Sequence, residues 1–224
     1  MHISIIIPVL NEETALENNL KKLQWVRRLG HEIIVVDGGS HDKSVALSES
    51  LASRVVYSPP GRALQMNAGA KTATGDVFLF LHIDTLLPND AITVLEQGMS
   101  DGLSGWGRFD VRLSGRHVLF RIIERMMNWR SRLTGIATGD QAIFVSRDLF
   151  ERLGGYPVIP LMEDIEISRR LKRYSKPVFF QQKVVTSSRR WEQGGICKTV
   201  WLMWRLRLAY WMRVDPTQLA KRYR

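Results

Sequence analysis

The feature that most constrains the fold is the apolar run at residues 77–83, which ends abruptly at the carboxylate of Asp84. Gly75 and Pro88 bound this run. A continuous apolar stretch of this length is typical of a strand that is buried on both faces, as in parallel sheets covered by helices. Ligands of such sheets bind beyond the carboxyl ends of the strands, so we expect a cation or a polar substrate beside Asp84.

Predicted strands and helices alternate over the first hundred residues. Further apolar strands are predicted at residues 3–8, 32–37 and 54–57. Asn11 is predicted to cap a helix that runs from Glu12 towards Leu29. This alternation indicates an α/β protein with right-handed crossovers and a mixed, mostly parallel sheet flanked by helices.

The second half of the chain continues with both kinds of element. Residues 105–113 alternate between apolar and polar side chains, which predicts a half-exposed strand. A helix is predicted at 116–133, a strand at 141–145 and another helix at 162–171. We therefore expect one main domain over residues 1–191, followed by a C-terminal extension over 192–224.

Composition limits the environment and the partners. A single cysteine, Cys197, excludes an intramolecular disulfide framework, and neither a signal peptide nor a membrane-spanning run is recognisable. We therefore expect a cytoplasmic protein. The formal net charge of +10 calls for an anionic partner, which could be nucleic acid, an anionic lipid surface or a phosphorylated ligand.

Polar side chains gather at the predicted strand ends. Asp37 and Asp84 each follow a strand, so both are expected at one edge of the sheet, with His82 beside Asp84. One carboxylate and several phosphate oxygens suffice to bind a divalent ion, which would neutralise a departing diphosphate. Arg62 and Asn67 are expected near the same edge, where they could meet a phosphate or a base, or serve only in capping and surface solvation.

Two adjacent acids follow a proline-rich loop. Glu163 and Asp164 occupy the first turn of a predicted helix, where acids often serve only to stabilise the helix N-terminus. If an acceptor hydroxyl attacks in a single displacement, it needs a general base opposite the leaving group. Asp164 is the preferred candidate for this base and Glu163 the alternative.

Four motifs occur in the order expected of one known family. They are Ile5-Ile6-Ile7-Pro8-Val9-Leu10-Asn11-Glu12, Val36-Asp37-Gly38-Gly39-Ser40, Leu81-His82-Ile83-Asp84 and Glu163-Asp164. The chain thereby resembles the family 2 glycosyltransferases with the GT-A fold. The resemblance covers residues 3–191 and its specificity lies in the set of motifs.

The resemblance implies an inverting transfer from a nucleotide-diphospho-sugar, such as a UDP- or GDP-sugar, with Mn²⁺ or Mg²⁺ as the metal. It implies that Asp84 binds the metal, that Asp37 contacts the base or ribose, and that Asp164 is the base. The predicted donor-binding residues are Pro8, Asn11, Glu12, Asp37, Gly38, Arg62, Asn67, His82 and Asp84. His82 replaces the first acid of the Asp-x-Asp motif, and a serine stands at the glutamine position of the motif of processive members. Processive polymerisation is therefore disfavoured.

Two other functions compete with this interpretation. A nucleotidyltransferase would need a glycine-rich, lysine-bearing loop after the first strand, where this chain has Pro8-Val9-Leu10-Asn11-Glu12. A basic module that binds nucleic acid or an anionic surface would explain the charge. Because no nucleic-acid reading motif is recognisable, we expect no nucleic-acid partner.

The C-terminal extension is basic and rich in tryptophan. Between Ile196 and Arg213, apolar side chains fall on one broad arc of a predicted helix, with basic residues opposite. This pattern suits a helix that rests peripherally on anionic lipid at the inner face of the cell membrane and presents a lipid-linked acceptor. A helix packed on the core, or in a homodimer, fits the same pattern equally well.

Overall fold

The computed structural model describes residues 1–100 and 105–223. Within these residues the strands form one sheet, whose order is β3-β2-β1-β4-β7-β6-β8-β5. Its strands are β1 (Ile3–Val9), β2 (Glu32–Asp37), β3 (Arg54–Tyr57), β4 (Val77–Phe80), β5 (Thr85–Leu86), β6 (Trp106–Leu113), β7 (Phe144–Ser146) and β8 (Val178–Thr186).

The sheet is mixed and mostly parallel, which confirms the predicted α/β class. Strand β1 pairs in parallel with β2 on one side and with β4 on the other. Strand β7 runs antiparallel to both β4 and β6, whereas β6 and β8 are parallel. The chain leaves β1 and β4 towards opposite sides of the sheet, so their carboxyl ends mark the switch point at which such sheets bind ligands.

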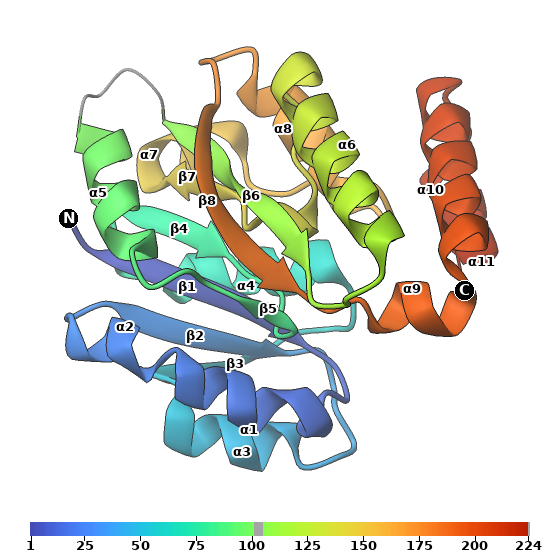
Figure 1. The fold of residues 1–224 in the computed structure, drawn as a ribbon. Coiled ribbons are helices and arrows are strands. Elements are labelled where there is room, and N and C mark those ends of the chain that lie inside the picture. The colour runs from blue at the N-terminus through green and yellow to red at the C-terminus, as the bar shows by residue number, and fades with distance from the viewer. Residues whose placement is uncertain (101–104, 224) are drawn as a thin grey trace.

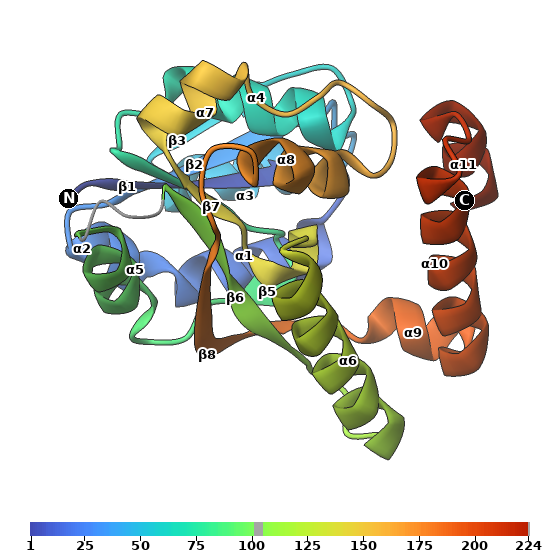
Figure 2. The same cartoon turned by 90° about the horizontal axis from the view of Figure 1, so that it is seen from above.

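Helices cover both faces of the sheet (Figures 1 and 2). The helices are α1 (Glu13–Lys22), α2 (Gln24–Arg28), α3 (Ser44–Leu51), α4 (Arg62–Thr72), α5 (Ala91–Ser100), α6 (Val118–Thr134), α7 (Arg147–Leu153), α8 (Glu163–Leu171), α9 (Arg189–Gly194), α10 (Ile196–Trp211) and α11 (Pro216–Tyr223). Figure 2 shows α4, α7 and α8 on one face, with α1, α2 and α5 on the other.

Each face has its own apolar core because β1, β2 and β4 bury side chains in both directions. On one face Ile5 and Leu79 pack with Leu16 of α1. On the other face Ile6 and Phe78 pack with residues of α4, α7 and α8. The continuous apolar runs of these strands therefore follow from burial on both sides.

The C-terminal helices form an arm beside this body (Figure 1). Helix α10 packs on α11 and on the loop before α8, through Leu206, Leu219 and Leu161. Its tryptophans face outward, since Trp201 is 62% and Trp211 80% exposed. Among the described helices none combines the length and apolarity needed to cross a bilayer.

The predicted role of Asn11 as a helix cap is wrong. Its backbone φ of 54° lies in the left-handed region, and the α1 N-cap is Glu12 without a side-chain hydrogen bond. The Asn11 carboxamide instead accepts a hydrogen bond from the His41 amide at 2.9 Å. The single helix expected up to Leu29 is divided into α1 and α2.

Strand β6 is buried, contrary to the half-exposed strand predicted from its alternation. Arg108 is 0% and Asp110 6% exposed, because α6 covers the polar face of the strand. Arg108 forms an ion pair with Asp110 and donates to the Ser131 hydroxyl at 3.1 Å. Asn128 hydrogen-bonds both the amide and the carbonyl of Val111, at 2.9 and 3.0 Å. The buried polar residues of β6, Arg108 and Asp110, are thus paired within the protein.

Two strands are shorter than predicted. Strand β4 ends at Phe80, so Asp84 lies in the turn between β4 and β5 rather than at a strand end. The strand expected at 141–145 begins only at Phe144, because a 3-10 turn occupies Gly139–Gln141. Both differences lengthen the loops at the carboxyl edge of the sheet.

Substitution of Asn128 tests the buried polar contacts between α6 and β6. Asn128→Ala leaves the amide and carbonyl of Val111 unpaired at a buried position, so we expect a loss of about 2 kcal/mol in the free energy of unfolding. Urea denaturation measures it. Arg125→Ala, at an exposed position of the same helix, is the control and should change stability by less than about 0.5 kcal/mol. Equal losses of stability in the two variants would contradict the stabilising role of the Asn128 hydrogen bonds.

Candidate active site

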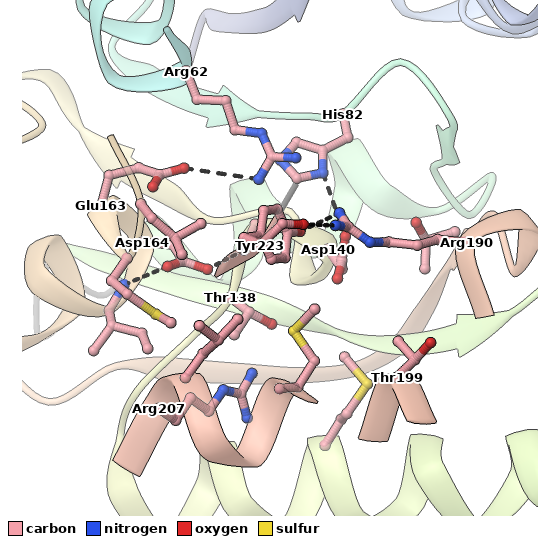
Figure 3. Close-up of a pocket in the computed structure, with 18 of the residues that line it drawn as sticks. Arg62, His82, Thr138, Asp140, Glu163, Asp164, Arg190, Thr199, Arg207 and Tyr223 are labelled. Atoms are coloured by element: carbon pink, nitrogen blue, oxygen red, sulfur yellow. Dashed lines mark hydrogen bonds and ion pairs between the residues drawn. The ribbon is translucent and has the colours of Figure 1, made fainter. Parts of the chain in front are cut away.

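A cavity of about 810 Å³ opens at the carboxyl edge of the sheet. Its walls come from the end of β1, the start of α4, the β4–β5 turn, α6, the loop at residues 138–140, the start of α8, and α10. Figure 3 shows charged side chains converging on it from several of these elements. Residues far apart in the sequence therefore share one hollow at the switch point of the sheet.

Asp84 and His82 line the cavity from the β4–β5 turn. The Asp84 carboxylate is half-buried, and its one hydrogen bond from the described residues comes from its neighbour Thr85, at 3.5 Å. The His82 Nδ1 atom lies 3.4 Å from the Asp140 carboxylate. A side-chain carbon at Gly139 would lie 2.6 Å from the His82 ring, so the absence of a side chain there lets the 138–140 loop pack against the histidine.

The acids at the start of α8 have different surroundings. Both carboxylate oxygens of Asp164 accept backbone hydrogen bonds, from Gly139 at 3.0 Å and from Ile165 at 2.7 Å, which fixes its orientation at the cavity wall. Glu163 is 5% exposed and lies 3.9 Å from the Arg62 guanidinium. Burial raises the pKa of Glu163, the charge of Asp164 raises it further, and Arg62 opposes both.

The end of β1 contributes another acid. Pro8 and Glu12 line the cavity, and Glu12 lies 3.7 Å from the Arg189 guanidinium. Burial raises the pKa of Glu12, against the opposing effect of Arg189, and the nearby Asp84 raises it as well. Glu12 and Asp84 therefore lie close enough to repel each other, which favours a cation between or beside them.

Four of the predicted donor-binding residues do not line this cavity within the described part of the chain: Asn11, Asp37, Gly38 and Asn67. The carboxylate of Asp37 is 3% exposed and accepts hydrogen bonds from the Gly39 and Ser40 amides, at 2.9 and 3.0 Å. The Asn67 amide bonds the backbone of Tyr156 in both directions, each at 2.8 Å. These side chains hold loops next to the cavity.

Several cavity residues were not predicted from the sequence: Gln65, Arg130, Asp140, Arg190, Arg207 and Tyr223. Gln65 donates to the carbonyls of Val9 and Val36, each at 2.8 Å, so its side chain ties the ends of β1 and β2 together. Arg190 hydrogen-bonds the Tyr223 hydroxyl and stacks on its ring. A polar glutamine in the otherwise apolar face of α4 was the one usable signal for Gln65.

One wall of the cavity is apolar. Helix α6 contributes Met126, Trp129 and Leu133, and α10 contributes Met203 and Trp204. Several of these side chains are also open to solvent; Trp129 and Trp204 are 66% and 62% exposed. The cavity therefore joins a charged floor at the sheet to an apolar opening between two helices.

The described residues contain no cluster of three or more His, Cys, Asp or Glu side chains that could bind a metal ion alone. Asp84 nevertheless has the chemistry of a shared site, because its carboxylate is nearly free of protein partners and faces the cavity. Mg²⁺ and Mn²⁺ accept such a single carboxylate when phosphate oxygens and water complete their coordination. The residues fit a metal that arrives with a diphosphate.

The sequence model of glycosyl transferase family 2 matches residues 4–153, more than half of the chain. The protein therefore belongs to glycosyl transferase family 2, which confirms the resemblance seen in its motifs. Membership in this family favours glycosyl transfer over the nucleotidyltransferase and nucleic-acid-binding alternatives.

Individual relatives agree with this assignment. The chain is 28% identical to the probable glycosyltransferase YdaM of Bacillus subtilis, over 98% of its own length and 56% of that protein. It is 25% identical to the dolichol-phosphate mannosyltransferase of Pyrococcus furiosus, over 75% of its length and 49% of that protein. The chain thus spans about half the length of these curated relatives.

The fold agrees with that of solved glycosyltransferases. The mannosyltransferase PcManGT from Pyrobaculum calidifontis, solved in complex with GDP-Man and Mn²⁺, superposes with a TM-score of 0.65 at 22% identity. The superposition covers 92% of this chain and 60% of that one. The predicted GT-A fold is confirmed by this likeness.

The raised pKa of Glu163 predicts a pH dependence of stability. In the unfolded protein Glu163 loses its proton near its ordinary pKa of 4.5, whereas in the folded protein it keeps the proton to a higher pH. As pH rises from 4.5 to the raised pKa, Glu163 therefore lowers the free energy of unfolding. Glu163→Gln should therefore stabilise the protein more at pH 7.5 than at pH 4.5, as measured by urea denaturation. A stabilising effect that shrinks as pH rises would refute the burial argument.

Proposed function

We propose that this protein is an inverting, metal-dependent glycosyltransferase, which moves a sugar from a nucleotide-diphospho-sugar to a hydroxyl group of an acceptor. The observation that supports it best is the cavity at the switch point of the sheet, lined by both Asp84 and Asp164. One carboxylate lies in the turn after the central strand β4 and the other at the start of helix α8. Asp84 is thus available to the donor and Asp164 to the acceptor.

The donor is assigned to the side of the cavity formed by the sheet. Pro8, Glu12, Arg62, His82 and Asp84 line that side and are the proposed donor contacts. The Arg62 guanidinium suits the diphosphate, since arginine binds phosphate oxygens through its fork of N–H donors. The GDP-Man and Mn²⁺ bound by PcManGT support a UDP- or GDP-sugar here.

Loops beside the donor side set its shape. Asn11 and Gly38 belong to the turns after β1 and β2, and Asp37 is the last residue of β2. Their hydrogen bonds hold these two turns together. We propose that these turns border the base and ribose. The Asn67 side-chain amide bonds the backbone of Tyr156 through both its nitrogen and its oxygen, which fixes α4 to the loop after α7.

In the proposed reaction the acceptor hydroxyl attacks the anomeric carbon on the face opposite the diphosphate. Asp164 takes the hydroxyl proton as the new C–O bond forms, and the bond to the diphosphate oxygen breaks with its electron pair. The configuration at the anomeric carbon is thereby inverted. The two backbone hydrogen bonds of Asp164 hold the carboxylate in position for this transfer. Glu163, paired with Arg62, is the alternative base.

Asp84 would bind the divalent metal, Mn²⁺ or Mg²⁺, together with the diphosphate. When bound, such an ion neutralises the charge that develops on the leaving group. The partly free Asp84 carboxylate and the nearby Glu12, which raises local negative charge, support a cation at this place.

The acceptor is proposed to be lipid-linked and the protein peripheral, at the inner face of the cell membrane. Helices α6 and α10 expose apolar side chains on either side of the cavity, among them Trp129, Leu133 and Trp211. Basic residues on α10, such as Arg205, accompany them. Tryptophan with arginine suits the headgroup boundary of an anionic membrane. The dolichol-phosphate mannosyltransferase among the relatives supports a lipid-linked acceptor.

Two substitutions separate donor binding from transfer. Asp84→Ala should abolish manganese-dependent binding of GDP or UDP in isothermal titration, whereas Asp164→Asn should leave that binding unchanged. Asp164→Asn should lower the transfer of labelled sugar into a membrane extract by a factor of about 10² or more, because the general base is lost. Nucleotide binding that is unchanged by Asp84→Ala and by manganese removal would exclude the proposed metal role.

Membrane binding is tested by co-sedimentation with vesicles. The protein should sediment with anionic phosphatidylglycerol vesicles at low salt and not with phosphatidylcholine vesicles. Trp201→Ser with Trp211→Ser should weaken this binding, and Tyr57→Ser, at a 65% exposed aromatic on the far edge of the sheet, is the matched control. If vesicles do not bind and the tryptophan substitutions instead disrupt a dimer, the face belongs to a homodimer.

A further inference from the structure

Four arginines line the cavity, and two of them have partners. Arg62 pairs with Glu163, and Arg190 is held by the hydroxyl, the ring and the backbone of Tyr223. The other two are Arg130 on α6 and Arg207 on α10. Neither of these guanidinium groups has a hydrogen bond or ion pair within the described part of the chain.

The unpaired state of Arg130 is unusual for its position. Its Nε and Nη2 atoms are buried and have no hydrogen-bond partner among the described residues. Burial lowers the pKa of Arg130 to about 10, and the positive charge of Arg207 acts in the same direction. Buried guanidinium nitrogens without a partner are costly, so in proteins they are normally paired with an anion. Arg207 is only partly buried but lines the same cavity, so an anionic ligand there would meet both side chains.

The two arginines line the cavity from the two helices α6 and α10. In Figure 3, Arg207 points into the cavity from α10, across from Arg62 and His82, with Thr138 and Asp164 between them. The charge of Asp164 acts on both Arg130 and Arg207 and stabilises their charged forms. Because an inverting displacement puts the base and the acceptor opposite the leaving group, groups beside Asp164 on this wall meet the acceptor rather than the departing diphosphate.

We propose that Arg130 and Arg207 together bind an anionic group of the acceptor, a phosphate or a carboxylate, next to the hydroxyl that Asp164 deprotonates. This inference rests on the proposed glycosyl transfer and adds the class of its acceptor. Two guanidinium groups from different helices supply the forked donors that such an anion accepts. The anion in turn draws α6 and α10 together across the cavity.

Sulfate is a suitable probe for the site. The full chain is first saturated with GDP or UDP and manganese, and sulfate is then titrated at constant ionic strength while the thermal unfolding midpoint is followed. Sulfate should raise the midpoint of the wild-type protein. Arg130→Met and Arg207→Met should each weaken the apparent sulfate affinity at least tenfold, while nucleotide affinity stays within twofold of wild type.

Matched controls come from the same helices. Arg125→Met on α6 and Lys198→Met on α10 remove exposed basic side chains and should respond to sulfate like the wild type. Arg130→Lys, which keeps the charge, should retain part of the sulfate response and serves if the methionine variant does not fold. Octyl sulfate distinguishes the source of the anion: tighter binding than sulfate indicates a lipid-linked group, and equal binding a water-soluble one. Both results support the site.

Three results would overturn the proposal. The first is a wild-type protein that binds nucleotide but does not respond to sulfate, which would leave the glycosyltransferase function intact. The second is a sulfate response of Arg130→Met and Arg207→Met that equals the response of the control variants. The third is a loss of nucleotide affinity in Arg130→Met and Arg207→Met, which would assign the pair to the donor diphosphate. Sulfate binding without any nucleotide binding would instead refute the proposed donor site alone.

Discussion

The pairing of β1 with a parallel strand on each side is the constraint on which the site depends. With β2 on one side and β4 on the other, the chain leaves these strands in opposite directions, and the loops at their carboxyl ends diverge. Gln65 ties the ends of β1 and β2 together, since its side-chain amide donates to the carbonyls of Val9 and Val36. The topology therefore opens the sheet at this edge, and side chains from α4, α6, α8 and α10 complete the cavity around that opening.

The sequence predicted the parallel half of the protein well because burial on both faces leaves a direct trace in composition. Strands β1, β2 and β4 read as apolar runs, and the motif residues follow them closely. Strand β6 was misread for the opposite reason. Its alternation of Phe109 and Val111 with Arg108 and Asp110 is that of a solvent-facing strand. Nothing local shows that Ser131 of α6 accepts a hydrogen bond from Arg108, or that Asn128 binds the backbone of Val111.

The second half of the site was beyond sequence reasoning for a related physical cause. Arg130 and Arg207 belong to helices in a chain with 32 lysines and arginines, where a solvated arginine is the ordinary case. Only the packing of α6 and α10 around the cavity distinguishes them from Arg125 and Arg205. The prediction for Asn11 was wrong for a similar reason, because a residue type that commonly caps helices here bridges two loops.

The charges around the cavity connect the proposed metal site with the proposed anion site. Five carboxylates line it, from Glu12, Asp84, Asp140, Glu163 and Asp164, against four arginines, a formal charge of one negative. Such a cavity would not attract a diphosphate by itself, so the proposed donor would need a cation at the acidic end near Asp84. The anion that we propose for Arg130 and Arg207 would balance the charge of these two side chains. With both bound, the separation of charge along the cavity would orient two negatively charged substrates towards each other.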